Sequence, residues 1–109
     1  MDGVTNVPEV TVSDIPADAT LLDVREQDEW DAGHAPGALH IPMGEVAGRL
    51  AELPDAPLHV ICRMGGRSAR VTQYLNANGW DAVNVGGGMT SWAAEGKPMA
   101  CASGDPEVI

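Results

Sequence analysis

Cys62 is the residue of this chain whose neighbours best suit covalent chemistry. It follows Leu58–Ile61, an apolar run typical of a strand buried on both faces, and it precedes two adjacent glycines and a helical segment. A thiol in this place faces a helix N-terminus, where partial positive charge and loop N–H groups favour the thiolate. Arg63 and Arg67 add full positive charges. The segment therefore predicts a nucleophilic sulfur inside a small anion-binding loop.

The elements that must position this loop follow a regular pattern. Short apolar or β-branched runs alternate with segments of helical spacing, which is typical of an α/β domain with a mainly parallel sheet. Ligands bind such sheets at the carboxyl ends of the strands, so this order places Cys62 at the binding edge. We expect strands at residues 9–12, 21–24, 38–41, 58–61 and 82–85, and helical segments around 26–32, 43–53, 71–75 and 89–93.

Length and charge limit the possible classes. A chain of 109 residues predicts a single domain over 1–109, with a core at about 8–98. Periodicity is lost after Lys97, so we expect a loose tail at 99–109. Acidic residues number 16 and basic residues 6, a formal charge of −10, which makes nucleic acid and anionic membranes poor partners.

The cysteine content and the N-terminus indicate a compartment. Two cysteines, Cys62 and Cys101, are too few for a disulfide scaffold. The first ten residues lack the basic and apolar regions of a secretory signal, and no apolar stretch approaches the roughly 18–20 residues that cross a bilayer. We therefore expect a cytoplasmic protein whose cysteines stay reduced and available for chemistry.

Four motifs in order resemble the single-domain rhodaneses, a family of sulfurtransferases. Residues 62–68, Cys-Arg-Met-Gly-Gly-Arg-Ser, resemble the family's active-site loop, and Leu22–Glu26 resembles its Asp-x-Arg strand end. Gly33–Pro42 resembles its Gly-His-Ile-Pro-Gly-Ala segment with Ala35 in place of the usual Ile, and residues 85–92 resemble its closing Gly-Gly…Trp signature. The resemblance covers about residues 10–98 and implies a rhodanese-like, three-layer α/β/α domain with a five-stranded, mainly parallel sheet.

The resemblance also implies a reaction. The Cys62 thiolate would attack the outer sulfur of a small anionic donor such as thiosulfate, and cyanide or a thiol would then take sulfur from the Cys62 persulfide. Arg63 and Arg67 are expected to hold the donor, because guanidinium groups pair well with oxyanions. Asp23 and Arg25 are expected to support the site, with a structural ion pair as the favoured reading, and no cofactor is implied. The expected substrate-binding set is Arg63, Met64, Gly65, Gly66, Arg67 and Ser68.

Several alternatives remain. A sulfur carrier or relay protein would take persulfide sulfur from a partner such as a cysteine desulfurase, with little thiosulfate turnover. Phosphatase chemistry is disfavoured, because it requires five residues between the cysteine and an arginine, whereas four separate Cys62 from Arg67. The histidines and cysteines show no metal-ligand spacing, so no metal is expected. Cys101 is an unused thiol or a resolving cysteine that attacks the Cys62 persulfide.

Overall fold

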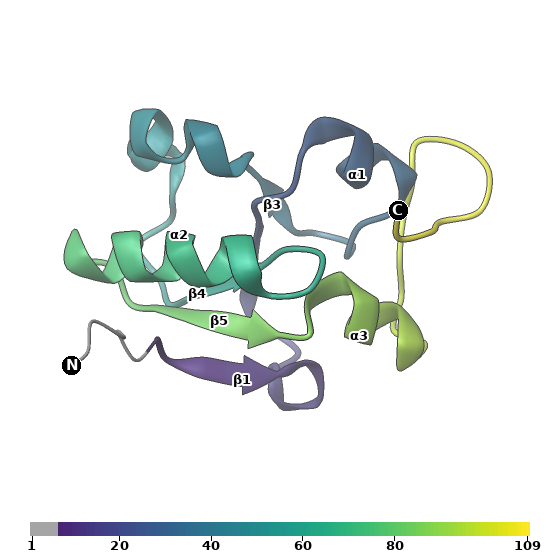
Figure 1. Ribbon diagram of the computed structural model, residues 1–109, viewed down its shortest axis with the longest axis horizontal. Helices are drawn as coiled ribbons and strands as arrows, with labels where there is room; N and C mark the ends of the chain where they lie inside the picture. The colour runs from purple at the N-terminus through teal and green to yellow at the C-terminus, as the bar shows by residue number, and fades with distance from the viewer. Residues whose placement is uncertain (1–6) are drawn as a thin grey trace.

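Five parallel strands form one sheet in the order β1-β5-β4-β2-β3, in a computed structural model that describes residues 7–109 (Figure 1). β4 lies at the centre of this sheet, between β5 and β2. The fold class predicted from the alternating pattern is confirmed, and the strands differ from the predicted ranges only at their ends. Their bounds are β1 Glu9–Thr11, β2 Thr20–Asp23, β3 Leu39–His40, β4 Leu58–Ile61 and β5 Ala82–Gly86.

Over residues 7–109 the chain forms three α-helices and three short 3₁₀ helices, which lie between successive strands except for α3, which follows β5. The helical spacing at 43–53 is present as two separate 3₁₀ helices, η2 and η3, rather than as one α-helix. Gly44 and Gly48 lie in this segment, and each glycine costs a helix about 1 kcal/mol relative to alanine. The bounds are η1 Val12–Asp14, α1 Gln27–Ala32, η2 Met43–Glu45, η3 Ala47–Glu52, α2 Gly66–Ala77 and α3 Gly88–Ala94.

Apolar side chains cover the sheet on both faces and give the domain its layers. Successive residues of a strand point to opposite faces, so Val60 joins one core cluster and Ile61 the other. The first cluster is closed by α2, η2 and η3, through residues such as Leu75 and Val46. The second is closed by η1 and α3, through residues such as Met89. This arrangement gives the three layers expected of the domain.

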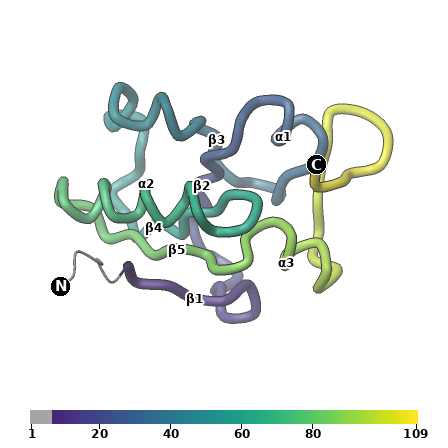
Figure 2. The backbone as a smooth tube through the Cα atoms, in the orientation of Figure 1, coloured from purple at the N-terminus to yellow at the C-terminus, as the bar shows by residue number. Residues whose placement is uncertain are grey.

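The C-terminal segment packs against the domain, where the sequence predicts a loose tail. Ala100 forms an antiparallel bridge with His34, and the Glu107 N–H donates to Ala32 O at 2.9 Å. Met99 and Val108 pack on the second core cluster. Figure 2 shows this segment returning beside α1. Backbone pairing of this kind leaves no periodic pattern in the sequence, which is why the docking was not foreseen.

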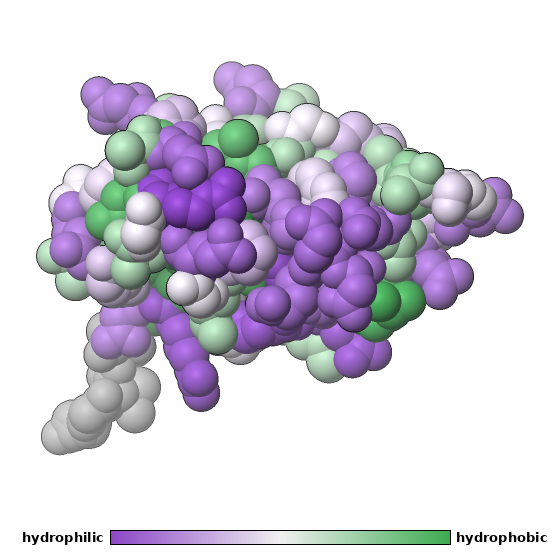
Figure 3. All heavy atoms as spheres, turned by 90° about the horizontal axis from the view of Figure 1, so that it is seen from above, coloured by the Kyte–Doolittle hydropathy of each residue, from purple (hydrophilic) through white to green (hydrophobic). Residues whose placement is uncertain are grey.

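The surface is mostly polar. Viewed from above, hydrophilic residues cover most of the visible face, and apolar residues show only as small separate areas (Figure 3). The large apolar side chains that are exposed include Met64, at 67%, and Tyr74, at 39%. Within the described residues, no helix is both long enough and apolar enough to cross a membrane.

Candidate active site

Cys62 follows the last residue of β4 and is only 1% exposed. The start of α3 fixes this strand end, because the Met89 N–H donates to Cys62 O at 2.8 Å and the Thr90 N–H donates to Arg63 O at 3.0 Å. Gly88 makes this approach possible. Its φ is +52°, and a Cβ atom there would collide with the carbonyl oxygens of Cys62 and Arg63. The sulfur is therefore held at the carboxyl edge of the sheet by a rigid backbone.

The Cys62 sulfur lies inside a ring of hydrogen-bond donors. The Gly65 N–H and the Ser68 hydroxyl each donate to Sγ at 3.1 Å. Burial raises the pKa of the Cys62 thiol, but hydrogen bonds from the Ser68 hydroxyl and from the N–H groups of Ser68, Gly65 and Met64 outweigh it. The pKa is therefore below its ordinary value, as a nucleophilic thiol requires.

Gly65 gives the loop its curl. Its φ is +116°, in the left-handed region that favours glycine, and α2 begins at the next residue, Gly66. Asn84 of β5 lies beneath it, 1% exposed, and its Nδ2 donates to Gly65 O at 3.2 Å and to Glu9 Oε1 at 2.9 Å. Sequence reasoning missed Asn84. The sequence offered one signal for this residue, which is that Asn84 is the single amide side chain within the otherwise apolar run at 82–85.

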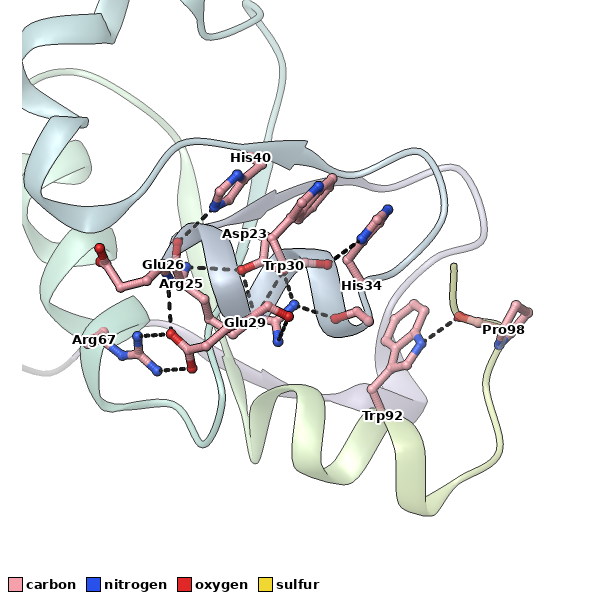
Figure 4. Close-up of polar contacts among 11 residues, drawn as sticks. Asp23, Arg25, Glu26, Glu29, Trp30, His34, His40, Arg67, Trp92 and Pro98 are labelled. Atoms are coloured by element: carbon pink, nitrogen blue, oxygen red, sulfur yellow. Dashed lines mark hydrogen bonds and ion pairs between the residues drawn. The ribbon is translucent and has the colours of Figure 1, made fainter. Parts of the chain in front are cut away.

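Arg67 is paired with a residue that the sequence reasoning also missed. Its Nη1 donates to Glu29 Oε1 at 2.7 Å and its Nη2 donates to Glu29 Oε2 at 2.9 Å, as Figure 4 shows. Glu29 comes from α1, 38 residues away along the chain. The hydrogen bonds from Arg67 are the main reason why the pKa of Glu29 is lowered to about 2. The sequence predicts that Arg67 holds the sulfur donor. In the structure, both Nη atoms of Arg67 instead donate hydrogen bonds to Glu29.

The other predicted residues separate into two groups. Arg63 and Met64 are exposed at the outside of the loop. Asp23 and Arg25 are both fully buried and form a multiply bonded ion pair, with Arg25 Nη2 at 2.7 Å from Asp23 Oδ2. Arg25 Nη2 also donates to Gly33 O at 2.8 Å, so this pair connects the end of β2 to the end of α1. The structural role of Asp23 and Arg25 stays a prediction, and this ion pair is the contact through which they would exert it.

The histidines and the second cysteine lie in other settings. His34 and His40 stack on the Trp30 ring, with centroids at 3.6 Å and 4.7 Å, and His34 Nδ1 lies 2.8 Å from Trp30 O. Cys101 is a free thiol whose Sγ donates to Gly104 O at 3.1 Å within the tail. Over residues 7–109, no cluster of three or more His, Cys, Asp or Glu side chains could hold a metal ion.

Comparison with known proteins agrees with this geometry. The family model described as "Rhodanese-like domain" matches residues 11–95. The chain belongs to the rhodanese-like family. A solved rhodanese-related protein from Thermoplasma volcanium is 33% identical, with a TM-score of 0.81 over 85% of this chain and 97% of that chain.

Two curated Bacillus subtilis relatives of this rhodanese-like chain carry different names. "Putative sulfurtransferase YtwF" is 44% identical over 79 residues, which cover 72% of this chain and 77% of that protein. "Putative sulfur carrier protein YrkF" is 32% identical over 102 residues, which cover 86% of this chain and 55% of that protein. Rhodanese-like chains similar to this one therefore carry names for both transfer and carriage of sulfur.

Proposed function

We propose that this rhodanese-like chain transfers sulfane sulfur from an anionic donor, such as thiosulfate, to a thiol or cyanide through a persulfide on Cys62. One observation carries the proposal. A thiol with a lowered pKa lies at the carboxyl end of the central strand, and a loop of N–H groups surrounds its sulfur. The names of related proteins support sulfur transfer as the general chemistry.

The proposed reaction has two steps. In the first, the Cys62 thiolate attacks the outer sulfur of the donor, the donor's S–S bond breaks, and sulfite leaves with the bonding electron pair. In the second, an acceptor thiolate or cyanide attacks the terminal sulfur of the Cys62 persulfide, and the Cys62 thiolate is regenerated. The donors around Sγ, from Gly65 and Ser68, stabilise negative charge on sulfur in both the thiolate and the persulfide.

The test is the mass of the intact protein. After incubation with thiosulfate, the protein should gain one sulfur atom, and cyanide or dithiothreitol should remove it. Cys62→Ser should prevent the gain, whereas Cys101→Ser, which removes the free thiol of the tail, should leave it almost unchanged. Absence of an adduct with every sulfane donor would overturn the proposal, and equal loss in both variants would make Cys101 part of the mechanism.

A sulfur-carrier function is the second candidate, because one relative bears that name. Cys62 would then receive sulfur from a protein persulfide, such as that of a cysteine desulfurase, and pass it to another protein. An assay that supplies a desulfurase and cysteine, without thiosulfate or cyanide, separates the two. Rapid persulfide formation there, with negligible thiosulfate turnover, would favour the carrier.

A further inference from the structure

The positive charge of Arg67, in the first turn of α2, is matched by a carboxylate. The two Nη atoms of Arg67 meet the two oxygens of Glu29 at 2.7 Å and 2.9 Å, the parallel arrangement in which guanidinium and carboxylate bind most strongly. The Arg67 and Glu29 side chains are 31% and 13% exposed. The Cys62 thiolate contributes, after Glu29, to raising the pKa of Arg67, so this ion pair lies within electrostatic reach of the reacting sulfur.

Glu29 is itself held in place. Its Oε1 accepts a hydrogen bond from the Glu26 N–H at 3.0 Å, which completes a capping box at the start of α1 (Figure 4). Its pKa of about 2 keeps it ionised throughout the neutral range. A donor that used Arg67 would have to displace a carboxylate that is already in ideal geometry and anchored to another helix. The pair therefore acts as a neutral unit beside the loop.

The remaining positive charge near Cys62 is limited. Arg25 is buried and committed to Asp23. Arg63 is exposed and forms no ion pair with another described residue. The sulfur therefore faces N–H dipoles, and the exposed guanidinium groups of this region are those of Arg63 in the loop and Arg70 in α2, on a chain whose formal charge is −10. Such a setting stabilises one negative charge better than two.

We propose that Glu29 is a specificity-determining residue, which neutralises Arg67 so that the Cys62 loop prefers sulfur donors with one negative charge over dianionic donors. The inference rests on the proposed function and narrows it. A persulfide on a cysteine side chain carries one charge at its reacting end, whereas thiosulfate carries two. Glu29 thereby favours a persulfide donor over thiosulfate.

Two small donors of similar shape isolate this charge effect. Thiosulfate and methanethiosulfonate both present a terminal sulfur on a sulfonyl group, but a methyl group replaces one charged oxygen in the second. Each gives the same product, because the Cys62 thiolate forms a bond to the terminal sulfur and the donor's S–S bond breaks. Sulfite leaves from thiosulfate and methanesulfinate leaves from methanethiosulfonate, each with the electron pair. Charge and atoms balance in both reactions.

The experiment measures the second-order rate constant of Cys62 persulfide formation from each donor, by quenching and intact mass. The wild-type protein should react faster with methanethiosulfonate. Glu29→Gln frees the Arg67 charge and should raise the ratio of thiosulfate to methanethiosulfonate rate constants about threefold to fivefold, the effect of one partly solvated charge. Glutamine keeps an Oε1 that can accept the Glu26 N–H, so the α1 cap is retained.

Control variants separate this effect from a change in net charge and from direct binding of the donor by Arg67. Glu45→Gln removes the same charge from an exposed pair with Arg49, and its ratio should match the wild type. Arg67→Gln leaves Glu29 unpaired, so its ratio should fall, and the double variant Glu29→Gln/Arg67→Gln should return to the wild-type ratio. If Arg67 bound the donor directly, the double variant would stay below the wild type, and that result would overturn the inference.

The outcomes also distinguish failure of the role of Glu29 from failure of the proposed sulfur transfer through Cys62. Adduct formation with an unchanged ratio in Glu29→Gln would refute only the role of Glu29. No Cys62 adduct from either donor, in any variant, would refute the proposed function.

Discussion

Replacing Ser68 with alanine tests the idea that hydrogen bonds activate the Cys62 thiol. The Ser68 hydroxyl is fully buried and donates to Cys62 Sγ at 3.1 Å. A hydrogen bond to a charged group contributes about 1.5–3 kcal/mol, and each ~1.4 kcal/mol changes an equilibrium tenfold. Three N–H groups continue to lower the thiol pKa, those of Ser68, Gly65 and Met64, so we take the low end of this range. The variant should contain about tenfold less thiolate at any pH below the thiol pKa.

The rate should change less than the thiolate population. A more basic thiolate is more nucleophilic, with a Brønsted coefficient of about 0.4–0.5, which recovers nearly half of the loss on a logarithmic scale. Ser68→Ala should therefore react about threefold to fourfold more slowly at low pH and faster than wild type on the alkaline plateau. The two pH profiles should cross, because the variant's thiol pKa is higher.

The assay is alkylation of Cys62 by iodoacetamide across pH, in a Cys101→Ser background so that one thiol reports. Ser13→Ala is the matched control, because the Ser13 hydroxyl donates to Glu95 and not to a cysteine. An unchanged profile in Ser68→Ala would refute the reasoning and assign activation to the backbone N–H groups. A uniform loss of rate at every pH, without a crossing, would show that Ser68 serves only the packing of the loop.

Three further predictions concern stability and are measured by denaturant unfolding. Because the pKa of Glu29 is lowered from 4.5 to about 2, its ion pair should stabilise the fold fully above pH 4.5 and lose that effect as the pH falls through about 2. Glu29→Gln should then lower the free energy of unfolding by about 1–2 kcal/mol at pH 7, a value reduced because Arg67 is partly exposed to solvent. The difference in unfolding free energy between variant and wild type should nearly vanish at pH 2. A difference that stays constant with pH would contradict the ion pair. Gly88→Ala should lower the free energy of unfolding by at least about 2 kcal/mol, because its Cβ would collide with the backbone of Cys62 and Arg63. Gly37 also has a positive φ but lies in open space, so Gly37→Ala should lower it by only about 1 kcal/mol. Equal losses would argue against the close approach of α3. Asp23→Ala should cost about 3–5 kcal/mol, because it leaves the buried Arg25 charge unpaired, and a loss below 1 kcal/mol would be inconsistent with that pair.

Much of the fold follows from local sequence patterns. Alternation of apolar runs and helical spacing predicted all five strands and their α/β class, because these periods reflect one strand face or one helix face at a time. The prediction of a single helix at 43–53 was wrong. This segment contains two glycines and forms two 3₁₀ helices, which pack on the core. The resemblance of four motifs to the rhodaneses added the family, which the comparison confirms.

The sequence by itself determined the place of Cys62. A thiol that follows the most apolar run and precedes Gly65 and Gly66 has to lie at a strand end beside a helix start, and these relations extend over only a few residues. Only the tertiary structure decided what surrounds that loop. Glu29 meets Arg67 across 38 residues, and Asn84 reaches Gly65 across 19. Such contacts depend on how whole elements pack together, which no local period encodes.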